Sequence, residues 1–545
     1  MRNRPDNHLY YGDNLDVLRE HIPAESVDLV YLDPPFNSNA NYNILFKSPA
    51  GASADAQIEA FEDTWHWNDH AEDAFDQVAR SGNTKAFDLL NAMRAFLGLN
   101  DMMAYLSMMA IRLIELHRVL KPSGSLYLHC DPTASHYLKL LLDGVFGAAN
   151  YRNEIVWKRQ SAQSDARHKF PDVSDAIFFY TKTQAAEFHP QYTEHDPDYI
   201  QKFYRFDDND GRGPYRLGDA ASPNPRPNLM YEWQGYSYPQ KGWRYQRDTM
   251  QRLHDEGRLY YPARADGSPD YDKRIALKRY LNEQQGSIVT NVWTDIQPLH
   301  SQEQERLGYP TQKPLALLDR IIAASSNEGD VVLDPFCGCG TAIHAAQKLD
   351  RQWIGIDVTH LAISLIEKRM KAAFPDIAFT VEGTPKDLAS AEDLARRDKY
   401  QFQWWAVSMV DAMPYGGKKK GADGGIDGII YFKPDGKRTE KALVSVKGGD
   451  SVGVQMIRDL HSAMEREKAP IGVFITKALP TTPMEREAAA VGRFEDGFGR
   501  TFPRLQILTL AELFQGKKPD IPYVDPGAAF RKAAREPGGT QGQLL

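Results

Sequence analysis

The chain has 545 residues, which is enough for about two to four domains. Its apolar content of 42% and charged content of 25% are those of ordinary globular proteins, and no apolar run is long enough to span a bilayer. Three cysteines are too few for a disulfide framework or a four-thiolate zinc site, and no signal-peptide core follows the N-terminus, so we expect a cytoplasmic protein. The net charge of −8 argues against non-specific coating of nucleic acid but permits a local basic cleft.

The first part of the chain alternates between strand-like and helix-like patterns. Residues 8–36 predict a strand, a helix and a buried strand that ends at Asp33. The apolar period over residues 52–120 predicts mostly helix, and residues 122–124, with the sequence Pro-Ser-Gly, predict a turn. Further predicted elements are a strand at 125–129, a helix at 133–146 and strands at 155–157 and 176–180. This alternation predicts an α/β fold on a doubly wound, parallel sheet.

The regular pattern is lost over residues 185–300, which are rich in Tyr, Trp, Pro, Gly and Arg. It resumes over about 311–382, and a second α/β-like segment covers about 398–515. The last residues predict a disordered tail. We therefore expect five parts, with the bounds 1–184, 185–300, 301–390, 398–515 and 516–545.

A glycine-containing loop follows the predicted strand at 331–333 and precedes a helix that begins near Thr341. Glycine lets a backbone approach a ligand closely, and a helix N-terminus favours a negative group. About 20 residues on, Asp357 ends the next strand, where a carboxylate can accept hydrogen bonds from ribose hydroxyls. A dinucleotide-binding unit is the alternative, although the loop lacks its G-x-G-x-x-G spacing. The candidate binding residues of the loop are Asp334, Pro335, Phe336, Gly338, Gly340 and Thr341.

Two cysteines in this loop, Cys337 and Cys339, could form half of a metal site. No second pair of ligands lies nearby in the sequence. Small residues packed in a tight turn are therefore the better interpretation.

The loop and the run Asp33-Pro34-Pro35-Phe36 resemble the cofactor and catalytic motifs of DNA amino-methyltransferases. The catalytic motif comes first, and this order resembles the permuted β class. The resemblance implies a permuted Rossmann-like domain, S-adenosylmethionine as cofactor and double-stranded DNA as substrate. It also implies that the exocyclic amine of a flipped base receives the methyl group.

The resemblance gives each catalytic candidate a role. The Asp33 carboxylate and the Pro34 carbonyl accept hydrogen bonds from the amine, which restores the nucleophilic lone pair. Phe36 offers a face on which the base stacks, and Pro34 with Pro35 holds the strand-end geometry. Adenine N6 is favoured because the motif opens with Asp33, whereas N4-cytosine enzymes more often open with serine. A strand-ending turn is the alternative for the isolated motif.

Two further residues are candidates for cofactor binding. Lys313, in the segment 309–314, is implied to pair with the methionine carboxylate, and an ordinary surface lysine is its alternative. Asp13 is implied to accept from the exocyclic amine of the cofactor's adenine, and a turn residue is its alternative.

The stretch 118–159 and residues 291–296 resemble the modification subunits of type III restriction systems, and this resemblance covers about residues 8–382. The segment 185–300 then stands where those proteins carry their target-recognition region. Its aromatic residues and arginines suit contacts with bases and phosphates, although most of the aromatic residues individually are better explained as core. The resemblance leaves open a homodimer and a separate restriction partner. The arginines are Arg205, Arg212, Arg216, Arg244 and Arg247.

The segment 398–515 resembles Mrr-like restriction endonuclease domains of the PD-(D/E)xK fold. In such sites two acids hold Mg²⁺ and a lysine positions water. Asp427 and Lys447 match this pattern, but Ser445 stands where Glu or Gln is usual. A nuclease-like site with Asp427 as metal ligand is therefore expected, while cleavage stays open. The candidates to replace the missing carboxylate are Asp423, Glu440 and Asp450.

Two other functions compete with DNA methylation. One is RNA methylation, against which the aromatic-rich segment and the nuclease-like segment argue. The other is a catalytically silent DNA-binding module, against which the intact residues 33–36 and the intact glycine loop argue.

Overall fold

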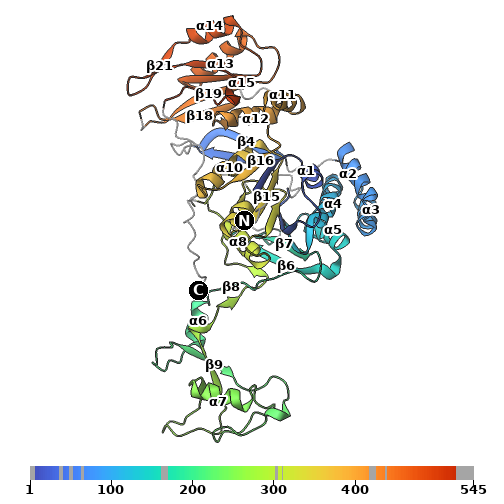
Figure 1. Cartoon of the computed structure of the whole chain (residues 1–545), viewed down its shortest axis with the longest axis vertical. Helices are drawn as coiled ribbons and strands as arrows, with labels where there is room; N and C mark the ends of the chain where they lie inside the picture. The colour runs from blue at the N-terminus through green and yellow to red at the C-terminus, as the bar shows by residue number, and fades with distance from the viewer. Residues whose placement is uncertain are drawn as a thin grey trace, which may run out of the picture. The chain divides into compact units, whose positions relative to one another are not determined.

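The computed structural model describes residues 7–35, 41–47, 53–62, 67–160, 168, 170–300, 303, 305–307, 309, 311–415, 425–435 and 438–522. Of these, the residues of Met1–His189 and Asn291–Thr540 form one compact unit, and those of Pro190–Thr290 form a second. The second unit lies within the irregular segment that the sequence delimits at 185–300. Figure 1 shows the course of the chain.

A nine-stranded sheet forms the centre of the first unit, in the order β13-β6-β7-β5-β2-β14-β15-β1-β16. Neighbouring strands are parallel except at β7, which runs antiparallel to both β5 and β6. The sheet is therefore the predicted parallel α/β sheet with one reversed strand. Its strands are β1 (Asn7–Tyr11), β2 (Val27–Leu32), β5 (Leu120–Cys130), β6 (Tyr151–Lys158), β7 (Ser174–Thr181), β13 (Val292–Trp293), β14 (Val331–Asp334), β15 (Gln352–Asp357) and β16 (Phe379–Glu382).

The helices of this part follow from caps and apolar stripes in the sequence. The asparagines at 68, 83 and 100 each accept a hydrogen bond from a backbone N–H of the first turn of α2, α3 and α4. α4 then buries most of its length in the main core, with Leu106, Leu113 and Leu116 fully buried. The helices are α1 (Asn14–His21), α2 (Asp69–Arg80), α3 (Thr84–Leu97), α4 (Asp101–Val119), α5 (Ser135–Phe146), α8 (Leu315–Ala324), α9 (Thr341–Lys348) and α10 (His360–Ala373).

The pairing of β2 with β14 joins the two sequence motifs in space. Leu29 lies opposite Val332, and Val30 lies opposite Leu333. Since both strands are parallel, Asp33 after β2 and Asp334 at the end of β14 stand at the same edge of the sheet. β15, which ends at Asp357, is the next strand along. Ligands of open α/β sheets bind at such an edge, so the sheet brings the candidate residues together.

Two sequence predictions about local structure are wrong. Residues 53–62 form a strand, β4 (Ser53–Glu62), paired with β3 (Asn41–Lys47), where helix was predicted. The sequence 54–60 alternates Ala or Ile with polar residues, a period of two that the helical propensity of alanine concealed. The predicted turn at 122–124 lies inside β5. A register shift between β2 and β5 accommodates it, because Val27 pairs with Leu120 but Leu29 pairs with Ser125.

The second unit is a small α+β structure with its own aromatic core. Trp233, Tyr236 and Trp243 are buried there with Leu259 and Ile275, as expected for most aromatic residues of this segment. Phe203, Tyr238 and Tyr271 remain exposed. The elements are β8 (Tyr192–Thr193), α6 (Pro197–Phe203), β9 (Tyr215–Asp219), α7 (Arg247–Asp255), β10 (Leu259–Tyr260), β11 (Ala276–Tyr280) and β12 (Ser287–Ile288).

The C-terminal part of the first unit holds a five-stranded sheet in the order β17-β18-β19-β20-β23. Alternating residues of β19 enter two cores: Val444 packs on one face with α11 and α12, and Leu443 packs on the other with α13 and α14. The elements are α11 (Leu388–Arg397), α12 (Lys399–Met409), β17 (Met413–Pro414), β18 (Gly428–Phe432), β19 (Glu440–Lys447), α13 (Val454–Arg466), β20 (Ile471–Thr476), α14 (Thr482–Ala490), β21 (Arg493–Glu495), β22 (Thr501–Pro503), β23 (Leu505–Thr509) and α15 (Leu510–Phe514).

A shared apolar cluster joins the two sheets of the first unit. We call it the junction cluster. It consists of buried side chains from the segment before α8, from the glycine loop, from α10 and from α12 with β17: Leu307, Tyr309, Cys339, Leu361, Leu365, Trp404 and Met413.

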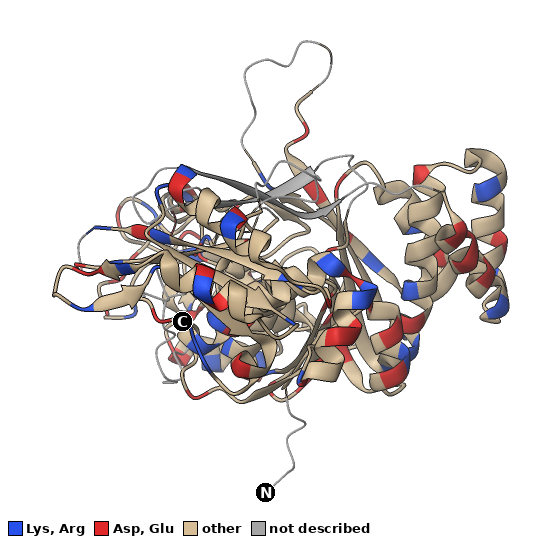
Figure 2. Cartoon of the chain, turned by 90° about the horizontal axis from the view of Figure 1, so that it is seen from above, with Lys and Arg blue, Asp and Glu red and all other residues tan. Residues whose placement is uncertain are grey.

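Charge and hydropathy do not divide the chain into blocks. Lys and Arg are interspersed with Asp and Glu over the ribbon (Figure 2). Within the described residues, no helix combines the length and the apolar character that a membrane span needs.

Candidate active site

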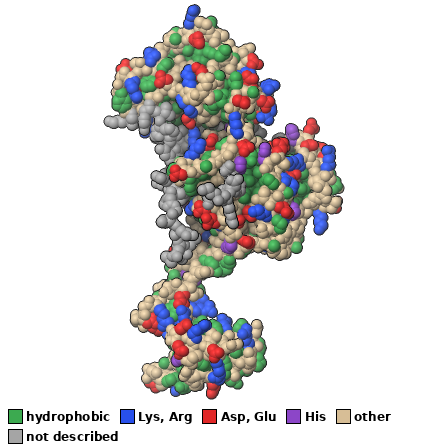
Figure 3. Space-filling model, viewed as in Figure 1, with side chains coloured by type: hydrophobic (Ala, Val, Ile, Leu, Met, Phe, Trp, Pro, Cys, Tyr) green, Lys and Arg blue, Asp and Glu red, His purple; other side chains and the backbone are tan. Residues whose placement is uncertain are grey.

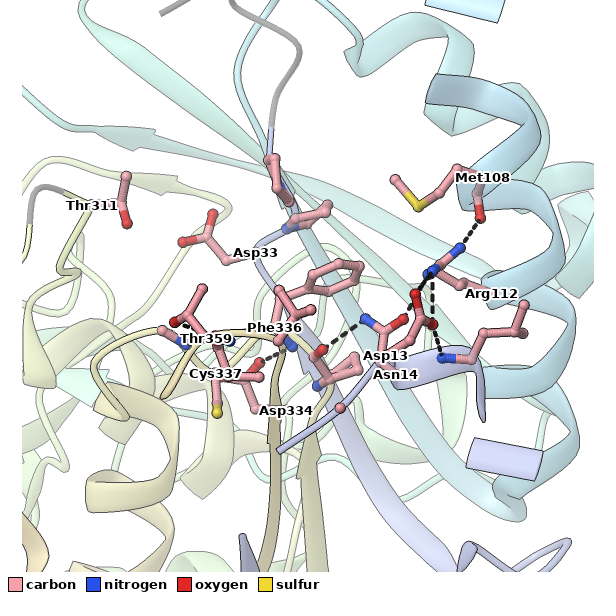
Figure 4. A pocket seen from close by; sticks show the side chains of 18 of the residues that line it. Asp13, Asn14, Asp33, Met108, Arg112, Thr311, Asp334, Phe336, Cys337 and Thr359 are labelled. Carbon is pink, nitrogen blue, oxygen red and sulfur yellow. Dashed lines mark hydrogen bonds and ion pairs between the residues drawn. The ribbon is translucent and has the colours of Figure 1, made fainter. Parts of the chain in front are cut away.

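A cavity of about 910 Å³ opens at the carboxyl ends of β1, β2, β14 and β15. Its size is that of a pocket for a nucleotide-sized ligand. Figure 4 shows that side chains from both sequence motifs converge on it, with Phe336 between Asp33 and Asp13. Gly340 is not part of the lining, and Phe36 lies outside the described residues. The candidate residues that line the cavity are Asp13, Asp33, Pro34, Pro35, Lys313, Asp334, Pro335, Phe336, Gly338, Thr341 and Asp357.

Asp33 has one engaged and one unengaged carboxylate oxygen. Its Oδ2 accepts a hydrogen bond from Lys313 Nζ, 280 positions away in the sequence. Its Oδ1 is buried and has no hydrogen-bond partner among the described residues. A buried carboxylate oxygen without a donor is costly. Its position in the cavity suits a ligand that brings an N–H group.

The glycines of the loop serve two different purposes. Gly338 has φ +48° and lines the cavity, and a Cβ there would lie 3.3 Å from Tyr309 Cε1. Gly340 has φ +77° and caps the N-terminus of α9, and a Cβ there would lie 2.8 Å from Ile366 Cγ1. Gly338 therefore keeps the cavity wall open, whereas Gly340 lets the loop pack on α10.

The two loop cysteines are buried in the turn. Gly340 N–H donates to the Cys337 carbonyl at 2.7 Å, and burial raises the pKa of both thiols. In the part of the chain that the structure describes, no group of three or more His, Cys, Asp or Glu could hold a metal. Both side chains are buried, as small residues packed in a tight turn are.

Asp357 holds the loop with both of its oxygens. Oδ2 accepts from Gly338 N–H at 3.0 Å, and Oδ1 accepts from the N–H and the Oγ1 hydroxyl of Thr359, both at 2.8 Å. Burial raises the pKa of Asp357 to about 6, and these donors oppose that rise. Burial also raises the pKa of Asp334 well above its usual range, helped by Asp33 and Asp357 nearby.

Asp13 faces a partner that the sequence did not reveal. Its Oδ1 accepts from Leu15 N–H at 2.7 Å and so caps α1. Both of its oxygens also accept from Arg112 Nη2 of α4, at 2.9 and 2.8 Å. Asn14 next to it accepts from Arg112 Nε at 2.6 Å and donates to the Pro335 carbonyl at 2.8 Å. The Asp13 carboxylate thus holds the wall of the cavity, and its predicted contact with the cofactor stays a prediction.

A buried polar chain under the cavity was also missed. Tyr31 lines the cavity, and its hydroxyl lies 3.0 Å from His129 Nδ1. His129 Nε2 lies 3.1 Å from Asp175 Oδ2. Burial opposes the charge of Asp175, but His129, Lys313 and Arg159 outweigh it and lower the pKa of this carboxyl. A histidine in the otherwise apolar strand 125–130 was the available signal.

The chemistry of the cavity fits the cofactor that the sequence predicts. Asp33, Asp334 and Asp357 suit a ligand that carries positive charge, such as a sulfonium and an ammonium group. Lys313 and the N-terminus of α9, at Thr341 and Ala342, suit its carboxylate. S-adenosylmethionine carries all three kinds of group.

The structure also brings the three nuclease-like candidates together. Asp427 precedes β18, and its Oδ2 accepts from Val446 N–H at 2.6 Å and from Ser445 Oγ at 3.4 Å. Lys447 Nζ lies 4.0 Å from the same oxygen. Ser445 and Lys447 share one face of β19 because residues i and i+2 of a strand do so.

The proposed substitutes for the missing carboxylate do not join this site. Glu440, at the opposite end of β19, pairs with Arg438. Asp450 is exposed and pairs with Lys477 at 2.5 Å. Asp423 lies outside the described residues.

The arginines predicted to contact DNA have varied surroundings. Arg212 pairs with Asp210 at 2.5 Å and lies over the ring of Tyr280, and Arg247 lies over the ring of Tyr231. Arg205 is exposed, Arg244 is half-buried, and Arg216 Nε is buried without a hydrogen-bond partner among the described residues. On the face drawn in Figure 3, this unit shows basic and acidic side chains close together. No single arginine stands out as a base reader.

Sequence comparisons identify two families along the chain. Residues 27–368 match the profile of a DNA methylase family that covers N6 and N4 enzymes. Residues 394–495 match the profile of a restriction endonuclease family, the Mrr catalytic domain.

Curated relatives agree with the first match. The type II methyltransferase M.EcaI of Enterobacter cloacae is 27% identical over 67% of this chain and 69% of its own length. The Mod subunit of the type III restriction-modification enzyme StyLTI of Salmonella typhimurium is 26% identical over 63% of this chain and 50% of its own length. The DNA adenine methyltransferase YhdJ of Escherichia coli is 25% identical over 67% of this chain and 83% of its own length.

These matches, the parallel sheet and the two motifs at its edge lead to one assignment. The chain belongs to the DNA methylase family of N6 and N4 amino-methyltransferases, and it carries a C-terminal domain of the Mrr restriction endonuclease type.

Proposed function

We propose that the chain is an S-adenosylmethionine-dependent, site-specific DNA methyltransferase that modifies N6 of a flipped adenine. One observation carries this proposal: Asp33, with its unpartnered oxygen, stands beside the glycine loop in a single cavity. A dinucleotide-binding unit would not need an acid of this kind at the neighbouring strand end.

The residues of the cavity have different proposed roles in methyl transfer. The cofactor supplies an electrophilic methyl group on a positively charged sulfur. The Asp33 carboxylate and the Pro34 carbonyl accept hydrogen bonds from the base amine, so that its lone pair is directed at the methyl group. With the cofactor bound, the amine lone pair would take the methyl group, whose S–C bonding electrons would stay on the sulfur of the leaving thioether, and a carboxylate oxygen such as that of Asp33, or water, would accept the amine proton. Gly338 and Asp357 shape the wall on which the cofactor rests.

Adenine is preferred over cytosine on two grounds. The motif opens with Asp33, which is typical of the N6 enzymes that it resembles, and one relative is named a DNA adenine methyltransferase. N4 of cytosine is the alternative target. The physical chemistry of the two amines is alike, so the choice depends on the shape of the base pocket.

The compact unit 190–290 is the proposed target-recognition region. It has its own core, which suits a module that sets sequence preference. Relatives that are Mod subunits of type III restriction-modification enzymes favour a separate restriction partner.

Expression of the chain in a host that lacks its own amino-methylation tests this function. Methylation-sensitive long-read sequencing of the host DNA should show N6-methyladenine at one sequence motif. The Asp33→Ala variant should leave the same motif unmodified. N4-methylcytosine instead would overturn the adenine assignment, and labelled methyl on RNA but not on duplex DNA would overturn the substrate.

A chimera tests the recognition region. Exchange of residues 190–290 for the corresponding segment of a relative should change the methylated motif while cofactor binding is retained. An unchanged motif would place sequence recognition elsewhere in the chain.

A further inference from the structure

The cavity holds more carboxylates than cations. Among its described lining residues, Lys and Arg are represented by Arg112 and Lys313. Arg112 is fixed by Asp13, by Asn14 and by the Met108 carbonyl, to which Nη1 donates at 3.2 Å. Lys313 is the other cation of this lining, and its Nζ contacts Asp33. The carboxylates of the lining are Asp13, Asp16, Asp33, Asp73, Asp334 and Asp357.

The backbone at Lys313 is anchored although its side chain is long and flexible. The side chain of Gln312 accepts from Leu307 N–H at 2.8 Å and donates to the Glu305 carbonyl at 2.7 Å. Pro314 directly after Lys313 is the N-cap residue of α8. A fixed Cα and a four-carbon stem allow the ammonium group to reach different acceptors inside the cavity without moving the wall.

Two anions compete for this ammonium group. One is Asp33, which Lys313 contacts in the structure. The other is the methionine carboxylate of the proposed cofactor. Arg112, the second cation of the described lining, is already held by Asp13 and Asn14. A carboxylate oxygen that accepts from a lysine is also a weaker acceptor for a base amine.

We propose that Lys313 is an exchange residue that holds Asp33 until the cofactor binds and then moves to the methionine carboxylate. The inference rests on the proposed function and adds an order of events to it. Cofactor binding would release both oxygens of Asp33 for the base amine, and the sulfonium would replace the lost positive charge near Asp33. By reciprocity, any ligand that engages Asp33 should strengthen the cofactor's hold on Lys313.

A matched pair of ligands isolates the methionine carboxylate. S-adenosylhomocysteine and its decarboxylated analogue, 5′-deoxy-5′-(3-aminopropylthio)adenosine, share the adenosine, the thioether and the amine. The ratio of their dissociation constants, measured by calorimetry on the full chain, therefore reports the contribution of the carboxylate. Because neither ligand carries a methyl donor, the readout is independent of turnover.

The exchange makes a specific prediction for Asp33→Asn. This variant removes the anion that competes for Lys313, so the methionine carboxylate should contribute more to binding. The ratio of the dissociation constant of the decarboxylated analogue to that of S-adenosylhomocysteine should increase roughly 10-fold. Lys313→Gln should abolish most of the contribution, weakening S-adenosylhomocysteine roughly 10- to 100-fold while the decarboxylated analogue changes little. In the double variant, Asp33→Asn should have no further effect, because the competition needs the lysine.

Asp319→Asn is the control variant. It removes a carboxylate from another Asp–Lys pair, with Lys348 at 2.9 Å, on α8 but outside the cavity lining. In this variant, the methionine carboxylate of the ligand should contribute as much to binding as it does in the wild type. Circular dichroism and thermal unfolding of each variant confirm that the fold is retained.

The outcomes separate the inference from the function. An unchanged or smaller carboxylate contribution in Asp33→Asn would show that Lys313 bridges both anions at once, which overturns the exchange but leaves methyl transfer intact. Failure of the wild type to bind either ligand would instead contradict the proposed function. Tighter binding of S-adenosylhomocysteine to Asp33→Asn, with no gain for its analogue, would support the exchange.

Discussion

Two sites of this chain contain an aspartate and a lysine, yet their surroundings differ. At the methylase cavity, Asp33 and Lys313 come from distant segments and stand among several other carboxylates in a volume of about 910 Å³. At the nuclease-like site, Asp427 directly precedes β18, and Lys447 ends β19, the strand that pairs with β18. Asp427 already accepts from the backbone of Val446, and Ser445 occupies the position of the second acid.

A matching motif does not by itself determine how sensitive a site is to substitution, because the surroundings of the motif differ. The methylase cavity has a carboxylate oxygen without a hydrogen-bond partner among the described residues, a lysine on the other oxygen of that carboxylate and room for a ligand. Among the described residues, Asp427 is the carboxylate that the nuclease-like site brings together with Ser445 and Lys447, whereas a Mg²⁺ ion prefers several oxygen ligands. The first site is therefore expected to be far more sensitive to substitution than the second. The following predictions test this ranking, from the largest effect to the smallest.

Asp33→Ala should have the largest effect. It removes the acceptor that activates the amine, so methyl transfer should fall by roughly one hundred- to ten-thousand-fold. Affinity for S-adenosylhomocysteine should not be lost, because Asp33 acts on the base. Single-turnover methylation measures the rate of methyl transfer, and calorimetry measures the affinity. A rate near that of the wild type would contradict the assignment of Asp33 as a catalytic residue.

Gly338→Val should nearly abolish cofactor binding. The residue has φ +48°, a conformation that costs about 1–2 kcal/mol for a side chain with a Cβ, and the new side chain would meet Tyr309 and the ligand. Gly340→Ala is the matched control in the same loop. It should lower the melting temperature through its contact with Ile366 but bind the cofactor with little change once folded. Equal losses of affinity would contradict the division of roles between the two glycines.

Asp357 should make cofactor binding depend on pH. Its pKa is raised to about 6, so the carboxylate gains its charge as the pH rises through about 6. Cofactor affinity should increase between about pH 5 and 7 and then level off, and Asp357→Asn should flatten this profile. The same shift means that the contribution of Asp357 to the free energy of unfolding is lost as the pH rises through about 6. At neutral pH, Asp357→Ala should weaken binding by roughly 1–3 kcal/mol.

The nuclease-like site should respond least. We expect at most weak plasmid nicking that needs Mg²⁺ or Mn²⁺ and disappears in Lys447→Ala, while methylation is unaffected. Ser445→Glu should raise nicking because it restores an oxygen ligand next to Asp427. If neither the wild type nor Ser445→Glu nicks methylated or unmethylated plasmid with either metal, the domain has no cleavage role.

Much of the fold could be predicted because its signals are local. The run 27–32 and the strand 331–333 are continuous apolar segments, and parallel strands that are buried on both faces have this pattern. The glycine loop likewise carries its geometry in its own residues. Residues 53–62 were mispredicted because alanine is compatible with both helix and strand, and only pairing with β3 decides between them.

The partners inside the cavity could not be predicted, because they come from elements that are distant in sequence. Nothing in Asp13 or its neighbours indicates that α4 presents Arg112 to it. The contact of Lys313 with Asp33 follows from the place of α8 beside the sheet, not from the segment around Lys313. Phe36 lies outside the described residues, so its role as a stacking face for the base stays a prediction.

The junction cluster gives the C-terminal domain a use that does not depend on cutting DNA. Trp404 and Met413 of this domain belong to the same buried cluster as Tyr309 and Cys339, both of which line the methylase cavity. A chain shortened before α11 would expose this apolar patch beside its own cofactor loop, at about 25 cal/mol per Å² of uncovered apolar surface. The domain is therefore part of the methylase architecture, and a lineage could lose its cleavage chemistry while still being unable to discard the domain itself.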